Sequence, residues 1–234
     1  MSIVALKDVS FRWRTGPPLL QIADFAVAAG ERVFLSGPSG SGKSTLLGLI
    51  GGVLTADSGS VRVLGESLGE LSAARRDALR VDRIGFIFQM FNLLPYLSVR
   101  DNVALPCRFS ARRRERATAN GIGVYAEAER LLGRLGLDDP ALLDRRVTEL
   151  SIGQQQRVAA ARALIGQPEL LIADEPASSL DADARANFLE LLMAECRAAG
   201  STVVFVSHDR SLAARFDRQV ALLELNELAR QRTT

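Results

Sequence analysis

Residues 37–45 of this sequence read Gly37-Pro38-Ser39-Gly40-Ser41-Gly42-Lys43-Ser44-Thr45. The run fits the pattern G-x-x-x-x-G-K-[ST], in which backbone N–H groups wrap a polyphosphate and glycines stand where side chains would obstruct the backbone. In such a loop Lys43 reaches the β- and γ-phosphates, and the Ser44 hydroxyl can bind Mg²⁺. We therefore predict a phosphate-binding loop. A plain Gly/Ser-rich turn is the alternative.

The sequence on either side of this loop favours the phosphate site. A short apolar strand predicted over Glu31–Ser36 runs into the loop, and Lys43–Gly51 has helical character. A helix that begins at the loop points the positive end of its dipole at the bound anion. Strand, loop and helix thus follow one another in the order that a phosphate site requires.

Strands are expected to dominate the rest of the N-terminal third. A turn at Gly16-Pro17-Pro18 separates the first two strands, and Ser72 is a candidate N-cap for a helix over Ala73–Arg80. The period-2 and apolar runs predict strands at Ile3–Trp13, Leu19–Val27, Gly59–Val63 and Ile84–Phe88.

The middle of the chain, 90–165, is predicted to be a helical insert, because its strand signals give way to helical ones. Helices are expected at Val99–Leu105, Arg112–Ala119, Ala126–Leu135 and Val158–Ile165. After the insert, strands alternate with helices, which implies a parallel sheet covered by helices. The expected strands are Leu170–Ala173, Thr202–Val206 and Val220–Leu225, with helices near Ala182–Ala198 and Ser211–Phe216.

The composition excludes several classes of protein. The chain has 234 residues, 29 Lys+Arg, 27 Asp+Glu, two Cys and one His. This length predicts one domain, or one domain with a subdomain. Two cysteines cannot build a disulfide framework or a zinc cluster, and one histidine cannot build a poly-histidine metal site. The net charge of +2 gives no general case for nucleic-acid binding.

No targeting or membrane-spanning segment is predicted. The start of the chain carries charges and lacks the apolar region of a secretory signal. The longest charge-free run, 84–99, is shorter than the roughly 20 apolar residues that a spanning helix needs. We therefore expect a cytoplasmic protein that does not itself cross the membrane.

A second candidate site follows the apolar run Leu170-Leu171-Ile172-Ala173, which ends in Asp174 and Glu175. A carboxylate at a strand end beside the phosphate loop can hold Mg²⁺, which is the role expected of Asp174. Glu175 would act as general base toward the attacking water. Acidic residues often follow strands for no chemical reason, so the pattern alone leaves both interpretations open.

The segment Leu150-Ser151-Ile152-Gly153-Gln154-Gln155 strongly resembles the LSGGQ signature of the ATP-binding cassette ATPases. The resemblance covers essentially the whole chain, because further motifs of the family follow one another in the family's order. These are Trp13, the loop 37–45, Gln89, the signature 151–155, Asp174-Glu175, Ser179-Leu180-Asp181 and His208.

This resemblance implies the fold. It is an α/β P-loop NTPase core with a mixed, mostly parallel sheet, flanking helices and an N-terminal antiparallel β subdomain, plus a helical subdomain. The expected boundaries are 1–89 and 166–234 for the core and 90–165 for the helical subdomain, all within one nucleotide-binding domain over 1–234. The implied cofactors are ATP, bound by all nine residues of the loop, and Mg²⁺.

The signature implies a head-to-tail dimer with a second copy of the chain. In the family the signature, here Ser151, Gly153 and Gln154, contacts the γ-phosphate that is bound by the other subunit. The alternative for Ser151 is a plain helix N-cap. Ile152 stands where the family has glycine, and its β-branched side chain restricts the backbone there.

The resemblance implies further roles, each with an alternative. Trp13 would stack on adenine, although Phe11 is a rival and Trp13 could be a core aromatic. Gln89 would bind Mg²⁺ and sense the γ-phosphate. Asp181 would bridge the dimer, which is compatible with a role as helix N-cap. His208 would contact the γ-phosphate and hold the attacking water, whereas a lone histidine is usually structural.

The chain resembles a stand-alone ATPase subunit that serves separate integral membrane permease subunits. It has one phosphate loop, whereas soluble cassette ATPases of translation carry two, and the stretch from Gln89 to Ser151 is too short for a long coiled coil. The segments 36–52, 84–103 and 99–106 look like the lipoprotein-release and macrolide-exporter branch. The alternatives are the ATPase of a non-transporting complex such as a cell-division regulator of that branch, and a soluble cassette ATPase without a permease. The resemblance places the protein on the cytoplasmic face of the membrane and predicts no nucleic-acid partner.

Two surface features are open to two interpretations. The apolar stretch Phe91–Tyr96 would line the groove that receives a helix of the membrane partner, or it belongs to the core of the helical subdomain. A run of arginines would contact anionic headgroups near the partner, or it is a solvated helix face. The run comprises Arg108, Arg112, Arg113, Arg114 and Arg116.

Overall fold

A computed structural model describes residues 2–230 of the chain. The chain divides into two compact units. Unit 1 comprises Met1–Arg80 and Thr202–Thr234, and unit 2 comprises Val81–Ser201. The predicted helical subdomain over 90–165 lies within unit 2. No helix of the described residues is long and apolar enough to cross a membrane.

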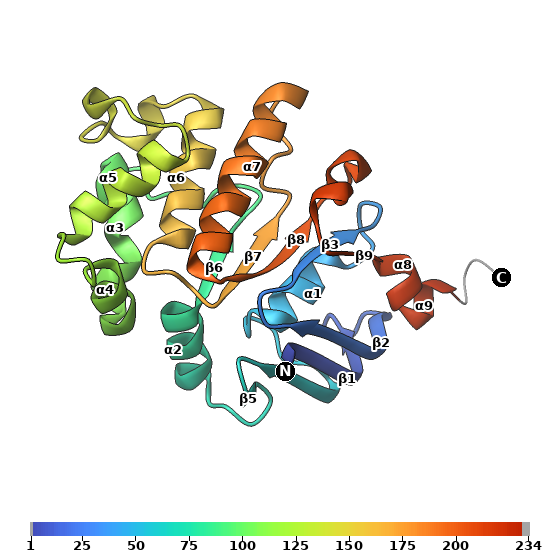
Figure 1. The fold of residues 1–234 in the computed structure, drawn as a ribbon. Helices are drawn as coiled ribbons and strands as arrows, with labels where there is room; N and C mark the ends of the chain where they lie inside the picture. Colours follow the sequence, from blue (N-terminus) through green and yellow to red (C-terminus); the bar gives the residue numbers. More distant parts are fainter. Residues whose placement is uncertain (1, 231–234) are drawn as a thin grey trace. The chain divides into compact units, whose positions relative to one another are not determined.

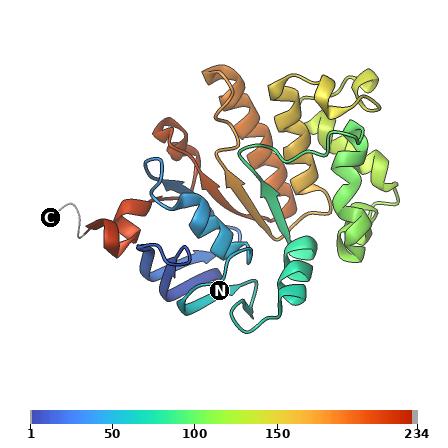
Figure 2. The same cartoon turned by 180° about the vertical axis from the view of Figure 1, so that it is seen from behind.

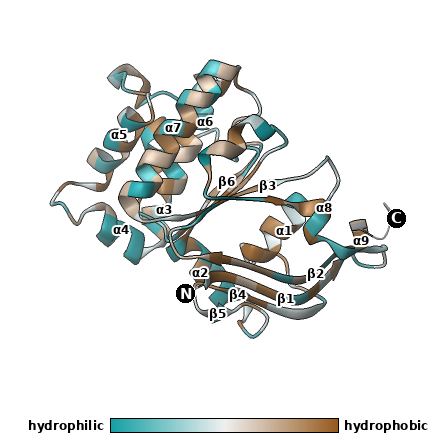
Figure 3. Cartoon of the chain, turned by 45° about the vertical axis from the view of Figure 1, so that its right-hand side comes forward, coloured by the Kyte–Doolittle hydropathy of each residue, from teal (hydrophilic) through white to brown (hydrophobic). Residues whose placement is uncertain are grey.

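Unit 1 begins with an antiparallel sheet in the strand order β2-β1-β4-β5. Alternate side chains of β1 and β2 are buried, as a period of 2 predicts, except that two successive residues are exposed at 7–8 and at 23–24. The hydropathy colouring of Figure 3 shows brown, apolar residues along these two strands. The strands are β1 (Ser2–Arg12), β2 (Pro18–Ala28), β4 (Ser58–Val63) and β5 (Glu66–Ser67).

The second part of unit 1 is built on parallel strands. β3 pairs in parallel with β8 on one side and with β9 on the other. The middle of β3 is fully apolar and buried, as expected of a parallel strand that is covered on both faces. These elements are β3 (Arg32–Ser36), α1 (Lys43–Ile50), β8 (Thr202–Val206), the 3-10 helix Arg210–Arg215, β9 (Arg218–Ala221), α8 (Leu222–Leu225) and α9 (Glu227–Arg230). Helix α2 (Ala73–Arg83) starts in unit 1 and ends in unit 2.

Unit 2 combines one parallel strand pair with a group of helices. β6 (Ile84–Ile87) pairs with β7 (Leu170–Asp174) in parallel. Figures 1 and 2 show the helices between these strands in sequence gathered together, with α3 against α4, α5 and α6. These helices are α3 (Val99–Phe109), α4 (Ala111–Ala117), α5 (Val124–Arg134) and α6 (Ile152–Leu164), with 3-10 turns at Pro140–Leu142 and Val147–Glu149. Helix α7 (Ala182–Ala199) follows β7.

Most predicted elements are confirmed, but the end of the chain is not. The strand predicted over Val220–Leu225 ends at Ala221, and Leu222–Leu225 is the helix α8. A short apolar run has no period that separates a strand from a helix, and Leu and Glu favour a helix once the strand has ended. The helix predicted to end at Leu105 continues through Pro106 to Phe109.

The arginine run in unit 2 serves the packing of the helices. Arg113 is 2% exposed and donates to the carbonyl oxygens of Ala163, Ile165 and Ile84. Burial lowers the pKa of its guanidinium to about 10. The prediction of a solvated helix face is therefore wrong for Arg113, because its side chain satisfies carbonyls that a buried helix end leaves open.

Three other arginines of the run have acidic partners within unit 2. Arg112 and Arg116 lie 2.6 and 3.8 Å from Glu169, and Arg108 lies 3.2 Å from Asp101. Hydrogen bonds from arginine side chains, first of all Arg83, hold the pKa of Glu169 below its usual range. The run thus binds elements of unit 2 to one another and does not form a patch of five unpaired cations.

Candidate functional site

The phosphate loop lies between β3 and α1, where the sequence predicts it. Gly42 has a φ of +100°, and a Cβ atom there would come within 2.8 Å of the Leu20 side chain. A Cβ atom on Gly37 would come within 2.7 Å of the Ser41 Oγ. The backbone path therefore requires glycine at 42 before any ligand is considered, whereas at 37 an added Cβ atom would first meet the end of the Ser41 side chain.

Two side chains of the loop are placed for an anionic ligand. The Lys43 Nζ donates to the carbonyl oxygens of Gly37 at 2.8 Å and Pro38 at 3.0 Å, which keeps the ammonium group over the loop. The Ser41 Oγ is buried, and among the described residues it has no hydrogen-bond partner. A buried polar atom without a partner is costly, so the loop gains when a ligand supplies one. Ser44, in the first turn of α1, is exposed.

Trp13 lies beside the loop in unit 1 and is half-exposed. Its ring is 54% exposed and contacts Phe11 edge-on, with the ring centroids 5.2 Å apart. Phe11 is 6% exposed and belongs to the core. Only Trp13 of the two thus presents a free aromatic face. A hollow lined by Trp13 also contains Gly40 and Ser41 of the loop.

His208 follows β8 and lies near the first residues of the phosphate loop. It is exposed, and it lines a small hollow together with Ser36, Gly37 and Pro38. Because β3 and β8 are parallel neighbours, the ends of both strands meet at one edge of their sheet. This register brings the single histidine to the start of the phosphate loop.

In unit 2, Asp174 ends β7, and Glu175 and Gln89 follow the neighbouring strands β7 and β6. Ile87 of β6 is in register with Ala173 of β7, so Gln89 and Glu175 both lie just past the same edge. Glu175 is 8% exposed and has a φ of +48°. A non-glycine residue in this left-handed region carries a local cost, and such residues are concentrated at functional sites.

The loop after Gln89 is held by two side chains of unit 2. Phe91 and Asn92 have φ values of +60° and +50°, and their carbonyl oxygens accept hydrogen bonds from Arg162 of α6, at 2.5 and 2.7 Å. Burial lowers the pKa of Arg162 to about 10. The fully buried Asn102 exchanges two hydrogen bonds with the backbone of Leu94. The chain after Gln89 therefore has a defined path.

The signature residues begin helix α6. Ser151 is its N-cap: the Ser151 Oγ accepts from the Gln154 N–H at 3.3 Å, and the Gln154 Oε1 accepts from the Ser151 N–H at 2.9 Å. This reciprocal pair is a capping box. Ser151 is nevertheless exposed, and Ile152 is 58% exposed. Asp181 likewise caps α7, accepting from the Ala184 N–H at 2.8 Å.

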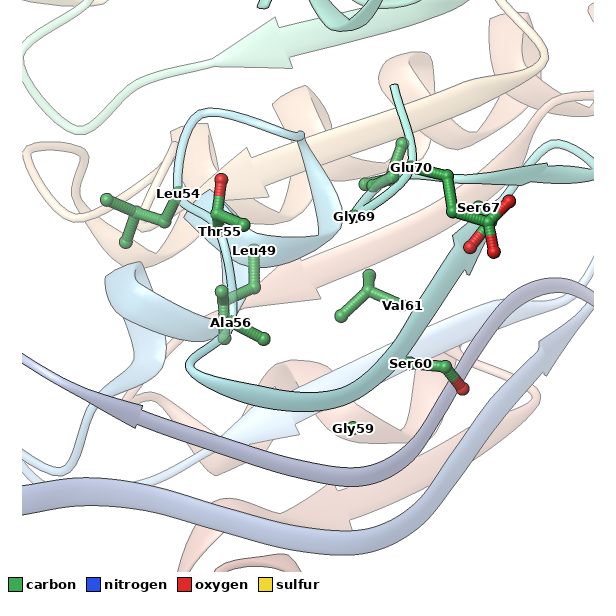
Figure 4. Close-up of a pocket in the computed structure, with 11 residues that line it drawn as sticks. Leu49, Leu54, Thr55, Ala56, Gly59, Ser60, Val61, Ser67, Gly69 and Glu70 are labelled. Atoms are coloured by element: carbon green, nitrogen blue, oxygen red, sulfur yellow. The ribbon is translucent and has the colours of Figure 1, made fainter. Parts of the chain in front are cut away.

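A further hollow in unit 1 does not suit a polyphosphate. Figure 4 shows it between the end of α1 and the strands β4 and β5, with Leu54 and Thr55 on one side and Ser67 and Glu70 on the other. The only charged side chain among its lining residues is the acidic Glu70. Phosphate binding needs cations or converging N–H groups, so the loop at 37–45 remains the candidate.

The residues named for Mg²⁺ offer suitable donors. Ser44, Gln89 and Asp174 supply a hydroxyl, an amide and a carboxylate, which are the oxygen ligands that Mg²⁺ prefers. The described residues contain no group of three or more His, Cys, Asp or Glu side chains that could enclose a metal ion. The donor set thus fits an ion that shares its coordination with substrate phosphates and water.

Comparison with known proteins settles the family. A family model described as ABC transporter matches residues 20–178. The chain belongs to the ABC transporter family. The lipoprotein-releasing system ATP-binding protein LolD of Shewanella frigidimarina is 38% identical to this ABC protein over 224 residues, which is 94% of the chain and 90% of LolD. The macrolide export ATP-binding/permease protein MacB of Mannheimia succiniciproducens is 36% identical over 95% of the chain, but this covers only 33% of MacB.

A solved structure agrees with the fold of this ABC protein. The dimeric post-hydrolysis state of the ATP-binding cassette MJ0796, bound to ADP and Pi, matches with a TM-score of 0.79 and 34% identity. The match covers 93% of each chain. The predicted α/β class, with its antiparallel β part, parallel strands and helical part, is confirmed.

Two residues that position the candidate sites escaped the sequence analysis. Arg162 belongs to no motif and lies in an alanine-rich stretch of α6. Asn226 follows the segment that was predicted as a strand. Neither an arginine nor an asparagine indicates such a positioning role by its residue type alone. Their roles depend on backbone carbonyls and N–H groups that only the folded chain brings near them.

Proposed function

We propose that this ABC ATPase binds Mg²⁺ and ATP with the phosphate loop 37–45 and hydrolyses ATP in a head-to-tail dimer, and that closure of the dimer drives separate membrane subunits. The observation that carries the proposal is the phosphate loop. Its left-handed Gly42, its Lys43 ammonium group and its buried Ser41 hydroxyl, which has no hydrogen-bond partner among the described residues, suit a polyphosphate. The remaining roles are assigned by the chemistry of each residue.

The binding residues act on different parts of the nucleotide. Trp13 stacks on the adenine ring, and Lys43 leaves the loop carbonyls to donate to the β- and γ-phosphates. Ser44, Gln89 and Asp174 hold Mg²⁺, which when bound neutralises charge on the phosphates. Positive charge placed beforehand near the γ-phosphate stabilises the charge that develops during transfer.

Two residues act on the attacking water. Glu175 accepts a proton from the water as general base, and its strained, largely buried position limits the orientations of its carboxylate. His208 donates a hydrogen bond to the γ-phosphate and holds the water in line, which its place beside Gly37 and Pro38 favours.

The second copy of the chain completes each site. Ser151, Gly153 and Gln154 contact the γ-phosphate that is bound by the other copy, where the N-terminus of α6 provides a favourable dipole. Asp181 bridges the two copies. MJ0796 supports the arrangement, since its post-hydrolysis structure is a dimer bound to ADP and Pi. Ile152, exposed at this surface, weakens the contact but does not abolish turnover.

The membrane partner is a permease of the kind that LolD and MacB name: a lipoprotein-releasing system or a macrolide exporter. The ATPase then lies on the cytoplasmic face of the membrane and transmits mechanical work for export or lipid release. Met90 and Tyr96, in the loop held by Arg162 and Asn102, are 81% and 72% exposed. Large apolar side chains exposed on an ordered loop are typical of a contact surface.

Tyr96→Ala tests this contact. We expect the variant to lose at least half of its co-purification with co-expressed permease subunits, while the ATPase rate of the isolated subunit stays unchanged. Phe109→Ala is the matched control, because Phe109 is equally exposed, at 74%, but lies at the end of α3. Equal retention of permease by both variants would refute the assignment of this loop. The measurement is the ratio of ATPase to permease after affinity purification in detergent.

A further inference from the structure

The hollow beside Trp13 has a second wall that none of the recognised motifs supplies. It is lined by Trp13 and by Gly40 and Ser41 of the phosphate loop. It is also lined by residues that follow β9, where a helical segment replaces the predicted strand. We call these residues the C-terminal wall: Leu223, Asn226, Leu228 and Ala229.

Asn226 fixes the wall to strand β2. Its side chain is 4% exposed, its Oδ1 accepts from the Gln21 N–H at 2.9 Å, and its Nδ2 donates to the Leu19 carbonyl at 2.9 Å. Asn226 thereby pairs with β2 as a neighbouring strand would. Figure 1 shows α8 and α9 beside β2, in line with their contacts to that strand. The wall is thus held at a set position within unit 1.

The chemistry of the hollow suits a flat apolar ring that is attached to a phosphate. Trp13 offers an indole face, whereas Leu223, Leu228 and Ala229 offer aliphatic surface. The polar atoms of Asn226 are engaged with the backbone of β2. Gly40 and Ser41 belong to the phosphate loop, so the hollow is continuous with it. Stacking and apolar contact respond to ring area and do not read the hydrogen-bonding edge of a base.

We propose that the C-terminal wall forms the second side of the base pocket, and that it makes the site selective for purine over pyrimidine nucleotides with little preference between adenine and guanine. The inference rests on the proposed function, since it takes Trp13 as the first side of the pocket. Leu228 is the wall residue whose substitution tests the inference most directly. Leu223 also lines the hollow that contains His208, so a substitution of Leu223 would disturb both hollows.

Leu228→Ala tests the wall. Dissociation constants for ATP, GTP, CTP and inorganic tripolyphosphate are measured by displacement of a fluorescent ATP analogue, with energy transfer from Trp13, the only tryptophan of the chain. We expect the constants for ATP and GTP to rise about fivefold, as for the loss of roughly one buried aliphatic contact. The constant for CTP should change less, and that for tripolyphosphate should stay the same.

Two controls make the outcome specific. Leu225→Ala removes the same side chain from the same segment, outside the lining of the hollow, and should bind all four ligands like the wild type. Leu228→Met restores the apolar contact and should restore ATP affinity. The inference is overturned if Leu228→Ala binds ATP like Leu225→Ala, or if it loses the same factor for tripolyphosphate as for ATP. The proposed function fails separately if the wild-type chain does not bind ATP, or if Trp13→Ala binds it unchanged by competition with a probe that does not use Trp13.

Discussion

Glu175→Gln is expected to reduce ATP turnover by about 10²–10⁴-fold, the contribution of a positioned general base. Glutamine keeps the size of the side chain and can keep its hydrogen bonds, but it cannot accept the proton of the attacking water at neutral pH. ATP binding should remain close to that of the wild type, because the residues assigned to the adenine ring and to the phosphates are unchanged. The rate falls while the affinity is retained.

Steady-state phosphate release and nucleotide binding together check this expectation. Glu190→Gln is the matched control, since Glu190 is an exposed glutamate on α7. It should turn over ATP like the wild type. If Glu175→Gln turned over ATP as fast as Glu190→Gln, Glu175 would not be the general base. Its left-handed backbone would then have no catalytic explanation.

Lys43→Ala should have the second large effect, on binding as well as on rate. A charged hydrogen bond to phosphate contributes about 1.5–3 kcal/mol, so ATP affinity should fall by roughly 10- to 150-fold. The loop also loses the ammonium group that donates to the Gly37 and Pro38 carbonyls. Turnover should become undetectable at ATP concentrations that saturate the wild type.

The chain offers a simple control for this change, because it contains only two lysines, Lys7 and Lys43. Lys7 is exposed on β1. Lys7→Ala should leave both ATP affinity and turnover unchanged. Calorimetric titration with ATP compares the three proteins, and a Lys43→Ala protein that binds ATP as tightly as Lys7→Ala would contradict the assignment of the phosphate loop.

Much of the fold could be predicted because local patterns and backbone requirements agree. Gly42 of the phosphate loop has a φ of +100° even without ligand, so this fixed position of the motif follows from the backbone path itself. Each half of β1 and of β2 keeps a period of 2 because one face is buried. Ser151 and Asp181 are caps by residue type as well as in the structure. These features depend on neighbours in the chain.

Other features depend on contacts that are distant in sequence. Arg113 looks like one cation of an exposed run, but 50 positions separate it from the Ala163 carbonyl that it satisfies. Asn226 is 205 positions from Gln21, whose N–H it binds. Phe91, Asn92 and Glu175 have left-handed backbone conformations, although none of them is a glycine, the residue type from which such a conformation is predicted. Side chains that serve a distant backbone leave no periodic trace in the sequence, which is why α8 was predicted as a strand.

The central claim is that the ATP sites are completed only between two copies of the chain. The molar mass of Glu175→Gln, measured by light scattering after gel filtration, tests it most directly. With saturating ATP and Mg²⁺ the mass should be twice the 25.3 kDa of one chain, and without nucleotide it should be that of one chain. Adding Ser151→Glu, which sets a carboxylate against the γ-phosphate, should return the protein to the single-chain mass. A Glu175→Gln protein that stays at 25.3 kDa under saturating ATP would contradict the account.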